Sequence, residues 1–226
     1  MKQPDIYIFD LGGVLIKLNV GRCMRAFEAL MGEENMRAVL GMDANGEGRR
    51  VDPSVNNIAA VSVASKQLMA DFERGLISPD AFIQEVRQYC HPGTTAAQVV
   101  DAWMAMLDEL PQERLAVVDR LRTQGHPVYL LSNGNDLHFE FINRTYGLEA
   151  HFDGLFLSQQ LHMSKPEQAI FQFVDERVKK LTNEGVKELK SEREVIFIDD
   201  IEMNRKAAER YVGWKTYSSL SEIITN

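Results

Sequence analysis

The chain has 226 residues, which is enough for one sizeable hydrophobic core with a smaller domain attached. Its formal charge of −8 and its pI of about 5.2 leave no basic stripe to neutralise phosphates, which argues against a nucleic-acid partner. No apolar run approaches the ~20 residues of a membrane span, which argues against a membrane partner. Two cysteines without metal-like spacing, and no signal-peptide pattern before Asp10, predict a cytoplasmic protein.

The first predicted element is a short strand buried on both faces. Residues 6–9 read Ile-Tyr-Ile-Phe, and Asp10 follows them directly. Ligands of an open parallel sheet bind just beyond the carboxyl ends of its strands, so Asp10 is placed where a ligand would bind. Gly12 and Gly13 come next and would let the backbone approach that ligand closely.

Helical periodicity then continues for about ninety residues. We expect the helices to form one bundle, inserted between the first strand and the rest of the sheet. Their expected ranges are 21–31, 35–40, 54–75, 78–89 and 94–107, with Ser78 and Thr94 or Thr95 as helix starts. Residues 41–57 have no period and predict a loop, in which Arg49 and Arg50 either reach a charged substrate or face solvent.

After Pro111 strands and helices alternate. We expect strands at 128–131, 155–157, 195–198 and 214–217, and helices at 111–125, 136–146, from 166 onward and at 204–211. A charged stretch at 179–194 reads as a solvated helix extension or loop. Alternating strands and helices imply right-handed crossovers, so the predicted fold class is α/β with a parallel sheet.

The strand at 195–198 ends on a pair of carboxylates, Asp199 and Asp200. Neighbouring like charges repel unless a cation neutralises them, and oxygen-only ligands of this kind suit Mg²⁺. The strand at 128–131 ends on Ser132, and Lys165 follows later. A carboxylate, a hydroxyl, a lysine and paired carboxylates together are typical of a site that binds a phosphoryl group.

Four motifs in this order resemble the haloacid dehalogenase superfamily of Rossmann-like hydrolases. They are the strand that ends in Asp-Leu-Gly-Gly, then Leu-Ser-Asn-Gly, Ser-Lys-Pro-Glu and Ile-Asp-Asp, and they span nearly the whole chain. The resemblance implies a Rossmann-like three-layer core formed by residues 1–16 and 109–226, with a helical cap domain at 17–108. It also implies a Mg²⁺-dependent phosphomonoester hydrolase whose substrate is a small phosphorylated metabolite such as a sugar phosphate.

The resemblance assigns a role to each candidate residue. Asp10 would be the nucleophile that forms an aspartyl-phosphate, and Lys165 would hold both nucleophile and phosphate. Ser132 and Asn133 would bind the phosphate. The expected metal site consists of Asp10, Asp200, the Gly12 carbonyl and Asp199, the last of which would orient Asp200.

Gly12 departs from the motif of this family, because the family's phosphatases usually carry a second Asp at this position. Sugar-phosphate phosphatase-like members and epoxide-hydrolase-associated domains share the Asp-Leu-Gly sequence. Two alternatives stay open: a metal-independent 2-haloacid dehalogenase, and a non-catalytic phosphate-binding protein of the same superfamily. The Asp199–Asp200 pair argues against the first, because it would repel an anionic substrate. The retained Asp10, Ser132 and Lys165 argue against the second.

Other polar residues of the chain receive structural interpretations. The five histidines share no ligand-like spacing, and His138 is expected on a helix surface. Asn135 or Asp136 is expected to cap the helix at 136–146. Asn204 lies one helical turn beyond Asp200 and is expected to support the metal ligands from the outer shell.

Overall fold

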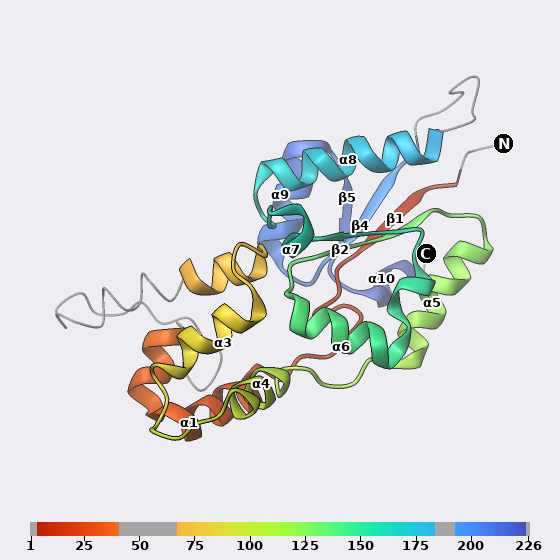
Figure 1. Ribbon diagram of the computed structural model, residues 1–226. Helices are drawn as coiled ribbons and strands as arrows, with labels where there is room; N and C mark the ends of the chain where they lie inside the picture. The colour runs from red at the N-terminus through yellow and green to blue at the C-terminus, as the bar shows by residue number, and fades with distance from the viewer. Residues whose placement is uncertain (1–3, 41–66, 184–192, 225–226) are drawn as a thin grey trace. The chain divides into compact units, whose positions relative to one another are not determined.

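The computed structural model describes residues 4–40, 67–183 and 193–224, and Figure 1 shows the chain. The loop predicted at 41–57, with Arg49 and Arg50, and most of the helix predicted from residue 54 lie outside these ranges. The chain divides into two compact units. The first, the core unit, contains Met1–Lys17, Glu109–Gly134 and Phe139–Asn226; the second contains Leu18–Asp108 and Asn135–His138.

The core unit is built on a five-stranded parallel sheet in the order β3-β2-β1-β4-β5. The strands are β1 (Ile6–Phe9), β2 (Val128–Ser132), β3 (Gly154–Leu157), β4 (Val195–Ile198) and β5 (Lys215–Tyr217). Every residue of β2 and β4 is buried, as expected for parallel strands covered on both faces. Phe9 of β1 pairs with Leu130 on one side and Ile198 on the other. Asp10 is therefore level with Leu131 and Asp199.

Helices cover both faces of this sheet, and Figure 1 shows α8 and α9 on one face with α5 and α6 on the other. The α-helices of this part of the chain are α5 (Gln112–Thr123), α6 (Asp136–Tyr146), α7 (Ser158–Leu161), α8 (Gln168–Asn183), α9 (Glu202–Val212) and α10 (Leu220–Ile224), and a 3₁₀ turn covers Leu148–His151. The first turn of α6 belongs to the second unit. The structure confirms the predicted α/β class with a parallel sheet between two helical layers.

Alternating strand residues form a core cluster against α8 and α9. It includes Ile8, Leu131 and Phe197 from the three central strands, and Phe171 and Val174 from α8. Each of these side chains is fully buried or nearly so. Burial of a large apolar side chain contributes roughly 1.5–3 kcal/mol, so this face of the sheet helps to fix the strand register.

The second unit is helical in the part of it that the structure describes. It contains α1 (Val20–Leu40), helical residues 67–73, α3 (Pro79–Arg87) and α4 (Ala96–Met104). Ser78 and Thr95 cap α3 and α4 as predicted. The two helices predicted at 21–31 and 35–40 are one element interrupted at Gly32, whose φ of 78° and ψ of 160° are not helical.

Helix α8 begins at Gln168, two residues after Pro166, where the sequence predicted its start. The helix continues to Asn183 and includes residues 179–183 of the charged stretch, which agrees with the first of the two predicted alternatives, a solvated helix extension rather than a loop. Its apolar side chains at Ile170, Val174 and Val178 lie one helical turn apart and keep the helix packed on the sheet. Among the described residues, no helix is long and apolar enough to cross a membrane.

Candidate active site

The carboxyl ends of β1 and β4 bring three carboxylates together. Asp10 follows β1, and Asp199 and Asp200 follow β4, its neighbour in the sheet. One oxygen from each of the three lies within 4.8 Å of the others. Asp10 and Asp199 are buried, whereas Asp200 is exposed. Carboxylates this close disfavour one another's ionised form unless cations lie among them.

Lys165 supplies one such cation inside the cluster. Its Nζ lies 2.9 Å from Asp10 Oδ1, donates to Asp199 Oδ2 at 2.7 Å and donates to the Leu131 carbonyl at 3.0 Å. The three ammonium protons therefore have three acceptors. The side chain of Lys165 is only 1% exposed, so the ion pairs are weakly screened by solvent.

The charges of these four groups sum to −2 when all are ionised. Burial raises the pKa of Asp10 to about 6, with Lys165 opposing the rise and Asp199 adding to it. The pKa of Asp200 is also raised, first by burial and then by Asp199. Burial alone would lower the pKa of Lys165, but Asp10 and Asp199 outweigh it, and the pKa is raised. A divalent cation would neutralise the cluster.

Asp199 is held on all sides by the protein. Its Oδ1 accepts from the Ile201 amide at 2.8 Å and from Asn204 Nδ2 at 3.2 Å, while Oδ2 accepts from Asn204 at 3.0 Å and from Lys165. Arg205 donates to the carbonyls of Asp199 and Asp200 at 2.6 and 2.8 Å. Asn204 thus contacts Asp199 rather than Asp200. Through these contacts Asp199 positions Lys165 and the end of β4. Asp200, which is exposed, is the carboxylate of the pair that is accessible to a metal.

Asp10, Gly12 and Asp200 each have an oxygen atom that could bind a metal. The two contacts of the Asp10 carboxylate, from Lys165 and from the Leu11 amide at 2.7 Å, both go to Oδ1, so Oδ2 accepts no hydrogen bond from the described residues. The loop after Asp10 is closed by hydrogen bonds of Gly13 and Ile16, none of which uses the Gly12 carbonyl. Asp10 Oδ2, the Gly12 carbonyl and Asp200 are oxygens of the kind that Mg²⁺ binds, so the residues fit that ion.

Gly13 is the residue that lets this loop approach Asp200. Its φ is 75°, and a Cβ atom on it would lie 2.1 Å from Asp200 Oδ2 and 2.5 Å from Asp200 Cγ. Any larger residue would displace the carboxylate. Gly12 lies outside the left-handed region, so its own backbone does not require glycine. Because the two glycines are adjacent, the sequence alone could not show that Gly13 and not Gly12 is the one required by the backbone.

Ser132 and Asn133 end β2 beside this cluster. Ser132 is buried, and its hydroxyl makes one long contact of 3.4 Å to the Asn133 carbonyl. The Asn133 side chain pairs with the backbone of Lys165, accepting from its amide at 2.9 Å and donating to its carbonyl at 2.8 Å. Asn133 therefore positions Lys165 through its side chain, in addition to any contact that its backbone makes with a phosphate.

The expectation that His138 lies on a helix surface is wrong. His138 is buried in the second unit, where its ring stacks on Trp103 with centroids 5.1 Å apart and planes 10° apart. Its Nε2 donates to the Trp103 carbonyl at 3.1 Å, and its Nδ1 accepts from Asn135 Nδ2 at 3.3 Å. Asn135 Oδ1 in turn accepts from the Trp103 indole at 3.3 Å and from the His138 amide at 3.0 Å, which makes Asn135 the helix cap. Burial lowers the pKa of His138 to about 4, so the ring is neutral.

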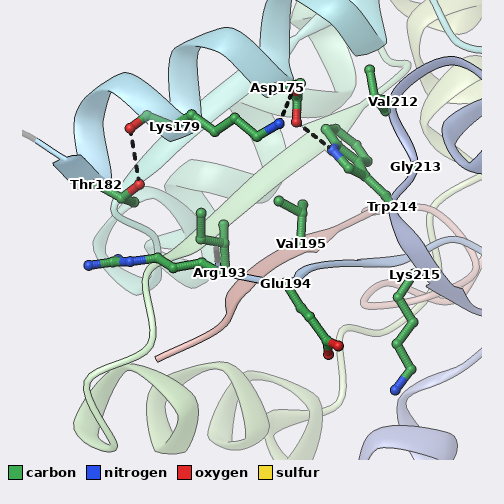
Figure 2. A pocket seen from close by; sticks show the side chains of 11 residues that line it. Asp175, Lys179, Thr182, Arg193, Glu194, Val195, Val212, Gly213, Trp214 and Lys215 are labelled. Atoms are coloured by element: carbon green, nitrogen blue, oxygen red, sulfur yellow. Dashed lines mark hydrogen bonds and ion pairs between the residues drawn. The ribbon is translucent and has the colours of Figure 1, made fainter. Parts of the chain in front are cut away.

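A cavity of about 660 Å³ lies elsewhere, at the edge where the strands begin. Its lining includes Ile6, Val195 and Lys215, the first residues of three strands, and Figure 2 shows the side chains around it. Asp175 there is paired with Lys179 at 2.8 Å and with the Trp214 indole at 2.9 Å. This cavity contains none of the predicted site residues.

Three comparisons agree with this geometry. The chain is 28% identical over 174 residues to the D-ribitol-5-phosphate phosphatase of Bacteroides thetaiotaomicron, an alignment that covers 74% of this chain and 73% of that protein. A haloacid dehalogenase family enzyme of the same organism, solved in complex with magnesium and inorganic phosphate, is 28% identical with a TM-score of 0.71, and covers 96% of this chain and 94% of its own. A predicted hydrolase of this type from Porphyromonas gingivalis is 27% identical with a TM-score of 0.69, over 99% and 98% of the two chains.

The family profile described as hydrolase, haloacid dehalogenase-like hydrolase, matches residues 4–211, which include every candidate residue of the site. The motifs, the parallel sheet and the order of the functional side chains along it lead to the same assignment. This chain therefore belongs to the haloacid dehalogenase-like hydrolases.

Proposed function

We propose that the protein is a Mg²⁺-dependent phosphomonoester hydrolase that acts on a small phosphorylated metabolite through an aspartyl-phosphate on Asp10. The observation that carries this proposal is the buried Lys165 ammonium between Asp10 and Asp199 in a cluster whose charges sum to −2. Such a cluster would repel any anionic substrate unless a divalent cation neutralised its charge. Asp10, the Gly12 carbonyl and Asp200 would hold the ion.

When bound, Mg²⁺ offsets the repulsion between an anionic phosphoryl group and the Asp10 carboxylate. The Asp10 carboxylate attacks phosphorus in line, the ester oxygen leaves, and water then hydrolyses the aspartyl-phosphate to release inorganic phosphate. Lys165 keeps Asp10 ionised and oriented through Oδ1. The Ser132 hydroxyl and the backbone of Asn133 bind the phosphoryl oxygens as their negative charge increases.

The leaving oxygen requires a proton, and Gly12 has no side chain to donate one. General acid catalysis typically contributes about 10²–10⁴ in rate. We therefore expect turnover to depend more strongly on the leaving group than in a phosphatase that carries an acid at this position. The residues 17–108 are proposed to form a cap domain that selects the leaving group.

The proposed substrate class is a phosphorylated sugar or polyol. It is supported by the activity named for the Bacteroides thetaiotaomicron relative, D-ribitol-5-phosphate phosphatase. A panel of sugar and polyol phosphates with purified protein and Mg²⁺ tests it, with release of inorganic phosphate as the readout. Activity confined to other phosphorylated metabolites would refute this substrate class without refuting the phosphatase.

The central test is hydrolysis of an aryl phosphate by the wild type and by Asp10→Asn. The wild type should need Mg²⁺ and lose activity in EDTA, and Asp10→Asn should fall to background because an amide cannot attack as an anion. Asp80→Asn, on the exposed first turn of α3, is the control and should keep wild-type activity. Release of halide from a 2-haloacid in EDTA would instead identify the dehalogenase alternative.

A further inference from the structure

Helix α7 carries a buried amide side chain that makes no hydrogen bond. Gln159 is 5% exposed, and neither its Nε2 nor its Oε1 has a partner among the described residues. Burial removes these groups from water, so leaving them unpaired costs folding free energy. An unpaired buried polar group in a native structure requires an explanation, and binding of a ligand is one.

The position of Gln159 relates it to Ser132. Ser132 of β2 pairs with Leu157 of β3, and Gln159 follows Leu157 by two residues. A Cβ atom on Gly134 would lie 3.7 Å from Ser132 Oγ and 4.0 Å from Gln159 Oε1, so both side chains border the same space beside Gly134. Gln159 therefore lies beside the serine proposed to bind the phosphoryl group.

The surroundings hold this arrangement in place. The Ser158 hydroxyl accepts from the Gly134 amide at 3.0 Å, which fastens the start of α7 to the loop after Ser132. Among the described residues, the Ser132 hydroxyl makes only its 3.4 Å contact to the Asn133 carbonyl and is thus poorly satisfied. Two adjacent, buried and poorly satisfied polar groups on a fixed scaffold are the pattern of a preorganised binding site.

We propose that the Gln159 carboxamide is a further binding group of the phosphoryl site. Neither of its polar atoms has a partner among the described residues, so a half-turn of the amide brings Nε2 to the position of Oε1 on the Ser132 side, where it donates an N–H hydrogen bond. This inference rests on the proposed phosphatase function. The ligand class is a phosphoryl oxyanion, either on the substrate or as inorganic phosphate, because an amide N–H donates and phosphoryl oxygens accept. A hydrogen bond to a charged acceptor is stronger than one between neutral groups.

Calorimetric titration of inorganic phosphate in the presence of Mg²⁺ tests the inference. Gln159→Met keeps the length of the side chain and removes its hydrogen-bonding atoms. We expect the Kd for phosphate to rise about tenfold or more, because a bond to a charged group is lost. Gln160→Met is the matched control, since Gln160 is the neighbouring glutamine and is exposed, and it should bind phosphate like the wild type.

Thermal unfolding without phosphate supplies the second readout. Gln159→Met should have a Tm equal to or above that of the wild type, because it replaces an unpaired buried amide with an apolar side chain. A fall in Tm with unchanged phosphate affinity would show that the amide stabilises the fold, and would overturn the inference. If Gln159→Met does not fold, Gln159→Glu decides, since its negative charge should weaken phosphate binding even further, and wild-type affinity would overturn the inference.

The wild type separates this inference from the proposed function. If wild-type protein with Mg²⁺ does not bind phosphate, the phosphatase proposal fails and the role of Gln159 fails with it. If the wild type binds phosphate and Gln159→Met binds it equally well, the role of Gln159 fails alone.

Discussion

Acidification should destabilise the second unit through His138. The ring is neutral in the folded protein, because burial lowers its pKa to about 4 from the ordinary 6.5. In the unfolded chain it takes up a proton below about pH 6.5. The stabilisation is therefore fully present above pH 6.5 and is lost as pH falls towards 4. A difference of about 2.5 pKa units corresponds to about 3 kcal/mol, a large part of the ~5–15 kcal/mol that stabilises a typical domain.

The hydrogen bonds around His138 also predict that acidification destabilises the second unit. Nδ1 accepts from the Asn135 amide, so a proton added there would face another donor and break the bond. The carboxylates of Asp10 and Asp200 act in the opposite direction. Because their pKa values are raised in the folded state, they favour folding as pH falls. The contribution of His138 is therefore obtained from the difference in the free energy of unfolding between the wild type and a His138 variant at each pH.

The assay is urea unfolding at several pH values between 7.5 and 4.5, monitored by Trp103 fluorescence in a Trp214→Phe background. Trp103 stacks on His138, and the chain has only these two tryptophans, so the signal reports on the second unit. His138→Gln should be less stable than its parent at pH 7.5, and the gap should shrink by about 3 kcal/mol at the acidic end. His91→Gln, at an exposed position of the same unit, should leave the pH dependence unchanged. Parallel curves for His138→Gln and its parent would refute the reasoning.

Three further predictions concern the core unit. In urea unfolding, Lys165→Met should lower the free energy of unfolding by about 3–5 kcal/mol, because it leaves two buried carboxylates uncompensated. Replacement of the exposed Lys179 by Met is the control and should cost less than about 0.5 kcal/mol. Gly13→Ala should weaken Mg²⁺ binding in calorimetry by displacing Asp200, whereas Gly12→Asp should fold and gain activity on alkyl phosphates. Mg²⁺ at a hundred times its Kd should stabilise the fold by about 2.7 kcal/mol in thermal unfolding, and no shift would contradict the metal site.

The strands and the residues at their ends could be predicted because they depend on local pattern. Apolar runs of four residues predicted β1 and β4, and Asp10 and Asp199 directly follow them in the sequence. The parallel class followed from the alternation of strands and helices. That β1 and β4 are neighbours did not follow from pattern, because strand order depends on which crossovers pack best across the whole sheet.

The contacts that position the site could not be predicted, because they join residues far apart in the sequence. Asn133 pairs with the backbone of Lys165, which is 32 residues away, and His138 stacks on Trp103 and donates to its carbonyl, 35 residues away. A polar residue in the first turn of a helix otherwise has the pattern of an exposed one. Gln159 had the same pattern at the start of α7, and only its burial distinguishes it from Gln160.

Gly12 and Gly13 differ in whether the structure requires a glycine, and this difference matters for the choice of substrate. Gly13 is required by the geometry, since a Cβ atom there would overlap Asp200. Gly12 is not required by its backbone conformation, because its φ lies outside the left-handed region. The absence of an acid at position 12 is thus separable from the architecture that holds Asp10, Lys165 and Asp200 together. In the proposed mechanism it bears on proton delivery to the leaving group, and it therefore concerns the choice of substrate rather than the integrity of the fold or of the proposed nucleophile.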